Sequence, residues 1–141
     1  MPRTDSKTPF SARLKTETLA LLRRHADRVG EPQTALVERY LEEGLRMDDH
    51  PLISFRDGAA GRRPSLVGTR LDVWQVIETI RQNDNDVAAA AEYLELPRHR
   101  VEACVAYYAE YRDEIDEWTA RALDEAERSE SAWRRRQALF S

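Results

Sequence analysis

A solitary strand-like segment near the amino end places the strongest constraint on how this chain folds. Between Thr8 and Lys15 the apolar residues Phe10, Ala12 and Leu14 alternate with polar ones, which is the period-two pattern of a half-buried strand. No second strand-like segment follows until about residue 52. Because the backbone groups of a strand need hydrogen-bond partners, the pattern predicts that this segment pairs antiparallel with its copy across a two-fold axis.

Two helices are predicted directly after this segment. Thr16 is expected to cap the first helix and Gly30 to end it, while Pro32 suits the first turn of the second. Each helix has an apolar face at helical spacing: Leu19, Leu22, Ala26 and Val29 in the first, and Leu36, Val37, Tyr40, Leu41 and Leu45 in the second. About forty residues of strand, helix and helix are near the size below which a chain cannot bury a core alone, which again favours a dimer.

This order of elements, in residues 8–47, resembles the ribbon-helix-helix family of DNA-binding repressors. The resemblance implies a homodimer whose two-stranded ribbon enters the major groove of operator DNA, where an arginine bonds guanine bidentately. The amino end of the second helix would bind a phosphate. The expected DNA-binding residues are Ser11, Arg13, Lys15, Gln33 and Thr34. The alternative is that Ser11 and Arg13 are only the solvent-exposed face of a strand.

The distribution of charge separates the two ends of the chain, although the net charge of −4 argues against indiscriminate binding to nucleic acid. Residues 1–28 carry seven basic and three acidic side chains, whereas residues 113–130 carry eight acidic and two basic ones. This asymmetry indicates two different partners. The arm at residues 1–7 is expected either to add phosphate contacts or simply to fray.

Composition predicts a soluble, cytoplasmic protein. The chain has 141 residues, of which 41% are hydrophobic and 34% charged, and no window is apolar enough to cross a membrane. Cys104 is the single cysteine, so an intrachain disulfide is excluded and a reducing compartment is the natural location. We expect Cys104 to be a small buried side chain.

After a short polar boundary at residues 47–51, the sequence predicts a β-hairpin followed by three helices. The hairpin spans residues 52–70, with its loop at residues 57–61. Asp72 and Gln75 form a predicted capping box at the first helix, and Asp86 caps the second. The third helix, after Pro97, carries an apolar stripe that is expected to continue to Ile115.

The run from Pro64 to Val73, with Gly68, Thr69 and Arg70 at its centre, resembles the family called domain of unknown function 433 over about residues 51–112. That resemblance implies a winged helix-turn-helix-like module. It also implies an antitoxin of a type II toxin-antitoxin pair, of the Vap type, whose partner is often a PIN-type nuclease. The longer hairpin loop, at residues 58–63, departs from the compact family pattern.

A helix-turn-helix module raises the question of whether this part also reads DNA. Arg98, His99 and Arg100 would begin its third helix, and Arg62 and Arg63 would lie at the hairpin tip like a wing. The alternative, which we favour, is that these are solvated ends of a dimer or partner surface, because nearby acidic residues would face the same phosphates. Those acidic residues are Glu92, Glu95, Glu102 and Glu110.

The segment 113–141 is expected to be a partner-binding tail: a helix that loosens at Ser129–Ser131 before a basic and aromatic end. In a PIN-type nuclease an inserted arginine would pair with the carboxylates that hold Mg²⁺. The alternative is that Trp133 docks onto the core of its own chain. The residues expected to bind a toxin are Trp118, Trp133, Arg134, Arg135, Arg136, Leu139 and Phe140.

The predicted fold class is mainly α with minor β: a ribbon-helix-helix dimer (residues 1–48), a hairpin plus three-helix module (49–112) and a C-terminal tail (113–141). The sequence has no phosphate-binding loop, nucleophile triad or metal-ligand spacing, and His99 lacks partners, so we expect neither an enzyme nor a cofactor. The predicted function is an antitoxin that neutralises a nuclease toxin and represses its own operon. The alternative is a stand-alone repressor whose second domain oligomerises or senses a ligand.

Overall fold

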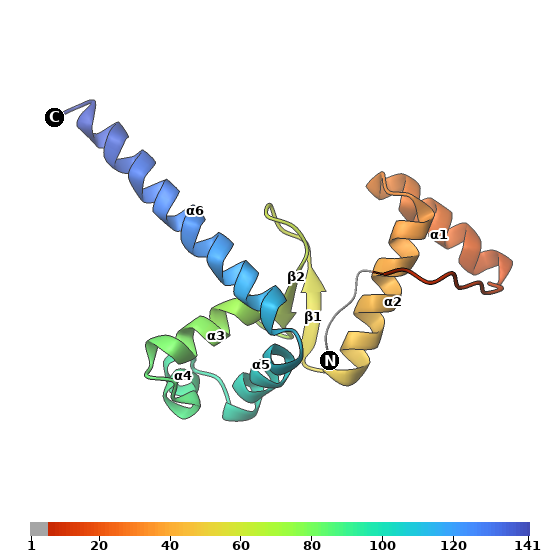
Figure 1. Ribbon diagram of the computed structural model, residues 1–141, viewed down its shortest axis with the longest axis horizontal. Coiled ribbons are helices and arrows are strands. Elements are labelled where there is room, and N and C mark those ends of the chain that lie inside the picture. The colour runs from red at the N-terminus through yellow and green to blue at the C-terminus, as the bar shows by residue number, and fades with distance from the viewer. Residues whose placement is uncertain (1–5) are drawn as a thin grey trace. The chain divides into compact units, whose positions relative to one another are not determined.

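The computed structural model describes residues 6–141 and divides into two compact units, Met1–Glu42 and Glu43–Ser141 (Figure 1). The described part is mainly helical with one small antiparallel sheet, which confirms the predicted fold class at this level. In chain order its elements are α1 (Thr16–Val29), α2 (Gln33–Asp49), β1 (Ile53–Arg56), β2 (Arg63–Leu66), α3 (Val73–Gln82), α4 (Val87–Leu94), α5 (Arg98–Glu110) and α6 (Arg112–Ala138). None of these helices is long and apolar enough to span a membrane.

The two helices predicted near the amino end are confirmed. Gly30 ends α1 in the left-handed conformation, with φ of 71°, and its amide donates to the carbonyl of Ala26. The helix begins one residue earlier than predicted: Lys15 occupies the N-cap position, and its carbonyl accepts from the amide of Leu19. Thr16 is therefore the first helical residue, and its prediction as the cap was wrong.

The strand predicted for residues 8–15 does not form within the single chain. Residues 6–15 lie in no strand, because a strand needs a hydrogen-bonded neighbour and, in the part of the chain that is described, neither β1 nor β2 pairs with this segment. The apolar side of the segment is left largely uncovered, with Phe10 83% and Leu14 49% exposed.

The second unit begins with the predicted hairpin. Strands β1 and β2 are antiparallel, with Ile53 opposite Leu66 and Arg56 opposite Arg63, and Gly58 and Gly61 exchange backbone hydrogen bonds across the loop. The capping box at α3 is confirmed: the side chain of Gln75 accepts from the amide of Asp72 at 2.8 Å.

Helices α4 and α5 are separated by a three-residue turn. The carboxylate of Asp86 accepts from the amide of Ala89 at 3.1 Å, which confirms the predicted cap of α4. Glu95 ends α4 in the left-handed conformation, with φ of 56°, and Pro97 precedes α5. A short turn of this length is typical of helix-turn-helix pairs.

The last two helices differ from the prediction in two respects. The chain bends at Tyr111, so Ile115 belongs to α6 and not to a continuation of α5. Helix α6 then runs unbroken through Ser129–Ser131, where a loosening was expected. Serine costs only a few tenths of a kcal/mol in a helix, and ion pairs at i,i+4 from Asp124 to Arg128 and from Glu130 to Arg134 support the backbone on both sides.

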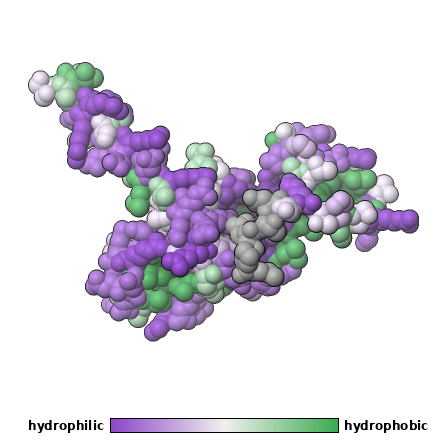
Figure 2. All heavy atoms as spheres, viewed as in Figure 1, coloured by the Kyte–Doolittle hydropathy of each residue, from purple (hydrophilic) through white to green (hydrophobic). Residues whose placement is uncertain are grey.

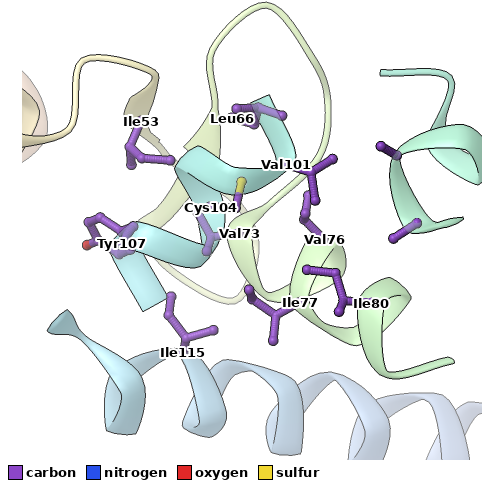
Figure 3. Packing of buried hydrophobic residues seen from close by; sticks show 12 residues of the cluster. Ile53, Leu66, Val73, Val76, Ile77, Ile80, Val101, Cys104, Tyr107 and Ile115 are labelled. Atoms are coloured by element: carbon purple, nitrogen blue, oxygen red, sulfur yellow. The ribbon is translucent and has the colours of Figure 1, made fainter. Parts of the chain in front are cut away.

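The core of the second unit lies where the hairpin, α3, α4, α5 and the first turns of α6 meet (Figure 3). Ile53 and Leu66 contribute the inner face of the hairpin, and Ile115 reaches the same cluster from α6. The remaining buried members are Val73, Val76, Ile77, Ile80, Ala90, Ala91, Val101, Cys104 and Tyr107, so the expected burial of Cys104 is confirmed.

Helix α6 has a packed part and an exposed part. Ile115 lies in the packed part and Leu123 in the exposed part, and their side chains contain the same number of carbon atoms. Replacing the fully buried Ile115 with Ala should lower the free energy of unfolding by about 2 to 5 kcal/mol, because a cavity is left in the core. The matched control, Leu123→Ala, removes a side chain that is 53% exposed and should cost well under half as much. Urea denaturation of both variants measures the difference, and equal losses would show that α6 does not close this core.

Candidate functional site

An open apolar groove lies between α1 and α2 in the first unit. It has a volume of about 540 Å³ and is lined mainly by apolar side chains, and Figure 2 shows apolar atoms at the surface of this unit. Its lining residues are Leu14, Thr18, Leu21, Leu22, His25, Val37, Tyr40 and Leu41. We call this surface the unit 1 groove.

The groove exists because the first unit buries very little of its own apolar surface. Of its described residues, 6–42, only the hydrophobic side chains of Ala26 and Leu36 are buried. Six large hydrophobic side chains of the same range are exposed: Phe10, Leu14, Leu21, Val29, Tyr40 and Leu41. An exposed apolar patch of this kind is typical of a binding surface.

The side chains predicted to contact DNA are exposed to solvent. Ser11, Arg13 and Lys15 lie in the segment before α1, and Gln33 and Thr34 begin α2. The two groups lie on different segments of the first unit, and the groove next to residues 6–10 is lined in part by Gln33 and Thr34. The structure thus leaves all five side chains available to an outside partner.

Most of the basic side chains of the first unit are not engaged by acidic ones. Lys7 pairs with Glu38 at 3.1 Å and Arg39 with Glu31 at 3.0 Å. In contrast, the described residues provide no ion-pair partner for the exposed side chains Arg13, Lys15, Arg23, Arg24 and Arg28. These five cations give the first unit a surplus of positive charge that faces solvent.

The Gly68-Thr69-Arg70 segment has a structural role as the turn between the hairpin and α3. Gly68 has φ of 77°, a conformation that other residues rarely adopt. The hydroxyl of Thr69 donates to the carbonyl of Leu66 at 2.8 Å and accepts from the amide of Leu71 at 3.0 Å. The carbonyl of Arg70 accepts from Arg56 at 2.5 Å, so backbone and hydroxyl groups fix this turn.

Asp72, at the end of that turn, joins the hairpin to α3. Its carboxylate is almost fully buried, and it lies 2.8 Å from Nη2 of Arg56 and 2.7 Å from Nε of Arg63. The indole of Trp74 donates to the same carboxylate at 3.2 Å. A carboxylate removed from water needs such partners, so Arg63 acts here as its counter-charge and not as a free wing residue.

The other arginines that could form a second DNA-reading surface are also engaged within the module. Arg62 donates to both carboxylate oxygens of Glu43, at 2.5 and 2.7 Å, and this hydrogen bonding raises the pKa of its guanidinium. Arg98 pairs with Glu102 at 2.7 Å, and Arg100 donates to the carbonyl of Val67. These contacts argue against a second DNA-reading surface in this module. They favour the alternative, in which it forms a surface for a second copy or for a protein partner.

A buried polar cluster joins the end of α2 to α5 and α6 within the second unit. Arg46 donates to the hydroxyl of Tyr107 at 3.0 Å and to Glu114 at 2.8 Å, and its guanidinium stacks 4.0 Å from the centre of the Tyr111 ring. Burial alone would lower the pKa of Arg46, but Tyr107 and Glu114 outweigh it and the pKa is raised. Burial raises the pKa of the Tyr107 phenol. The ring of His50 packs edge-on against that of Tyr107, with centroids 5.2 Å apart.

A second polar cluster fixes the first turns of α6 to α3 and α5. The hydroxyl of Tyr108 donates to Asp116 at 2.7 Å, and Arg81 donates to the same carboxylate oxygen at 3.1 Å. The hydrogen bond from Tyr108 is the main reason that the pKa of Asp116 is lowered. Since this lowering is a gain for the ionised form, the contribution to stability is present at neutral pH and is lost as the pH falls through the folded-state pKa of Asp116.

The rest of α6 is exposed, and it carries four of the seven residues predicted to bind a partner, Trp133 and Arg134 to Arg136; Leu139 and Phe140 directly follow the helix. After Thr119 no residue of α6 is buried; Trp133 is 58% exposed, Leu139 75% and Phe140 92%. The predicted alternative, in which Trp133 docks onto its own core, is therefore wrong. Trp118 differs from the others, because it is half-buried and its ring lies beside Gly61 and 5.1 Å from the guanidinium of Arg121.

The described residues, 6–141, contain no group of three or more His, Cys, Asp or Glu side chains placed to hold a metal ion. Burial raises the pKa of Cys104 to about 12, so this thiol is a poor nucleophile at neutral pH.

The hairpin and the helices α3 to α5 make up the part of the chain that matches a known family. Residues 53–108 match the model of the family described as protein of unknown function DUF433. The DUF433 module is thus shown for this part of the chain, as its sequence predicted. Neither the curated proteins nor the solved structures gave a significant match to the chain.

Sequence reasoning missed the polar clusters that attach the DUF433 module to its neighbours. Arg46 and Tyr107 are 61 residues apart, and Arg46 and Glu114 are 68 apart. Nothing in the local pattern distinguishes Arg46 from the solvated arginines around it. The one available signal was its position in the last turn of an amphipathic helix that ends next to a polar boundary.

Proposed function

We propose that the chain is a DNA-binding antitoxin: a homodimer that represses its own operon through its first unit and neutralises a nuclease toxin through the exposed part of α6. The unit 1 groove is the observation that carries the dimer. If the grooves of two copies packed against each other, the apolar side chains of both would be buried. Homodimers usually form through such symmetric, self-complementary surfaces.

In this proposal the segment 8–15 becomes a strand only when it meets its copy. Its alternating pattern and the lack of a strand partner within the described chain support an antiparallel ribbon, as in the ribbon-helix-helix proteins that the segment resembles. Ser11 and Arg13 would then face the bases of the operator, and Lys15 would contact phosphates. The surplus of unengaged basic side chains around them supports a polyanionic partner.

For the DUF433 module we propose a winged helix-turn-helix-like fold that acts as a scaffold and does not read DNA. The support is the engagement of its arginines: Arg62 with Glu43, Arg63 with Asp72 and Arg98 with Glu102. Arg62 and Arg63 would have to leave a largely buried carboxylate before they could bind a phosphate, whereas the pair of Arg98 with Glu102 is exposed and is the weakest of the three. The module instead carries the packed first turns of α6, whose exposed continuation is the proposed toxin-binding segment.

The proposed dimer predicts that a charge placed in the unit 1 groove separates the two copies. Leu41→Asp should weaken dimerisation by about a hundredfold or more, because the new carboxylate would be buried without a partner. The control is Ala20→Asp, which adds the same carboxylate to an exposed position of α1 outside the groove. Analytical ultracentrifugation of the full chain measures both. A Leu41→Asp chain that remains as dimeric as the control would contradict the proposed dimer.

The proposed DNA contact predicts different effects for two neighbouring cations. Arg13→Ala should reduce the discrimination between the operator and an altered site by about 1 to 3 kcal/mol, because a bidentate contact to a base is lost. Lys15→Ala should weaken binding to all sequences alike and lower the slope of log K against log salt by about one. Titrations of labelled upstream DNA at several salt concentrations measure both effects. If Arg13→Ala keeps its selectivity, the ribbon is not the reader.

The toxin-binding part is tested by shortening α6 without touching its packed turns. A chain that ends at Leu123 keeps the buried residues Ile115 and Thr119 and should unfold at nearly the same temperature as the full chain. When it is co-expressed with the product of the adjacent gene, it should no longer co-purify with that product, whereas the full chain should. Retention of the partner by the shortened chain would instead favour a repressor whose α6 has another role.

A further inference from the structure

The unit 1 groove contains one side chain that can gain a charge close to neutral pH. His25 lies on α1, is half-buried and lines the groove. Histidine is the side chain whose ordinary titration falls between pH 5 and 8. Of the other described residues that line the groove only Tyr40 is titratable, and tyrosine side chains are ordinarily neutral in this range. The charge of the lining therefore changes through His25.

The charged side chains of α1 and of the segment before it do not compensate a charged imidazole. Arg28 lies one turn after His25 on the same helix, where it would repel an imidazolium. Asp27 is two positions from His25, and residues at this spacing do not face each other on a helix. In the segment before α1, the cation Lys15 directly follows the lining residue Leu14.

The acidic side chains of α2 next to the groove do not compensate it either. Glu38 and Glu42 follow the lining residues Val37 and Leu41, but neither of them lines the groove. Glu38 is also engaged by Lys7, at 3.1 Å. The lining residues contain no carboxylate, so the imidazole of His25 is surrounded by apolar groups and neutral hydroxyls.

The polar groups in the lining are too weak to replace a carboxylate. Besides His25 they are the hydroxyls of Thr18 and Tyr40, which are neutral hydrogen-bonding groups. The guanidinium of Arg39 lies 5.7 Å from the centre of the Tyr40 ring, so the nearest charge on this side of the groove is a further cation. An imidazolium enclosed here would remain without a counter-charge.

We propose that His25 makes the dimer of the first unit depend on pH: the dimer forms while the imidazole is neutral and separates when the imidazole gains a proton. This inference rests on the proposed packing of one groove against the other. By symmetry, the second copy would bring the same side chains to the interface, and its groove would supply no carboxylate. Burial of an unpaired charge among apolar side chains is strongly unfavourable.

The direction of the effect follows from proton linkage. Burial in the dimer favours the neutral imidazole, so each copy that carries the extra proton must release it on association. The dimer is therefore favoured at higher pH and weakens as the pH falls. An exposed imidazole is half-protonated at about pH 6.5, so between pH 7.5 and 5.5 the association constant should fall by up to about tenfold for one site and about a hundredfold for two.

Loss of the dimer would also release the operator. The proposed ribbon forms from the segments 8–15 of two copies, so a separated chain has no ribbon to present to the major groove. Acidification would thus relieve repression by the first unit without any change in the second.

Sedimentation equilibrium of the full-length chain at pH 7.5 and 5.5 tests this proposal. For the wild-type chain, the dissociation constant of the dimer should rise by about ten- to a hundredfold at the lower pH. His25→Gln has a neutral side chain at both pH values, so the ratio of its two dissociation constants should stay within about twofold, whatever its affinity. The matched control His99→Gln removes an exposed imidazole at the start of α5 and should keep the ratio of the wild-type chain.

Each result decides for or against the proposal. A wild-type chain that is equally dimeric at both pH values would overturn the pH dependence and leave the proposed dimer intact. The wild-type ratio in His25→Gln would show that another group senses the pH, and would overturn the role of His25. A wild-type chain that is monomeric at both pH values would overturn the proposed dimer and this inference together.

Circular dichroism separates dissociation from unfolding. The helical signal of the wild-type chain should be the same at pH 5.5 and 7.5, because the proposal concerns only the contact between two copies. The buried His50 of the second unit is present in the wild-type chain and in both variants, so any contribution from it is common to all three. Loss of helix at pH 5.5 would overturn the proposal, since unfolding would then explain the loss of the dimer.

Discussion

The guanidinium of Arg46 lies almost out of contact with water, with 9% of its side chain exposed, and a charge in that position needs both acceptors and a counter-charge. The phenol of Tyr107, the carboxylate of Glu114 and the face of the Tyr111 ring supply them. These three groups come from α5, α6 and the bend between them. Removing one of them would weaken the compensation for a buried charge, so the end of α2, α5 and the start of α6 are stabilised together. The hairpin joins the same group through Phe55, whose ring packs edge-on against Tyr107.

The two units of the chain reach stability in different ways. The second has a closed core and a buried carboxylate, that of Asp72, with two arginines as counter-charges, Arg56 and Arg63. The first has Ala26 and Leu36 as its only buried hydrophobic residues in the range 6–42. Apolar burial is the main favourable contribution to folding, and the described part of the first unit has little of it. The proposals for dimerisation and DNA binding rest on this difference.

Local sequence patterns were sufficient to predict most elements, because their signals lie within a few residues. Gly30 at the end of α1, the capping box of Asp72 and Gln75, and Asp86 before α4 each act through hydrogen bonds to their own helix. The predicted loosening at Ser129–Ser131 failed for a related reason: serines are weak helix breakers, and the ion pairs on either side outweigh them. The bend at Tyr111 was missed because an apolar stripe alone does not show whether one helix or two carry it.

The candidate site was less predictable than the fold. Exposure of Arg13 was expected from the strand pattern, and exposure of Trp133 was one of two alternatives. The engagement of Arg62, Arg63 and Arg100 was not predicted, because their partners lie in other elements. The unit 1 groove could not be located before the relative placement of α1 and α2 was known. The sequence showed which charged and apolar side chains the chain has. The structure showed which of these side chains already contact partners within the same chain.

The free part of α6 has a consequence for the lifetime of the protein in a cell. Ion pairs within the helix, such as Glu117 with Arg121, each contribute only about 0.2 to 0.5 kcal/mol, and no residue of the described chain after Thr119 is buried. A helical segment held so weakly unwinds often and offers extended backbone to proteases, while the closed core before it does not. Degradation would thus begin in this part of α6, and any binding that covers it would lengthen the time for which the chain survives intact.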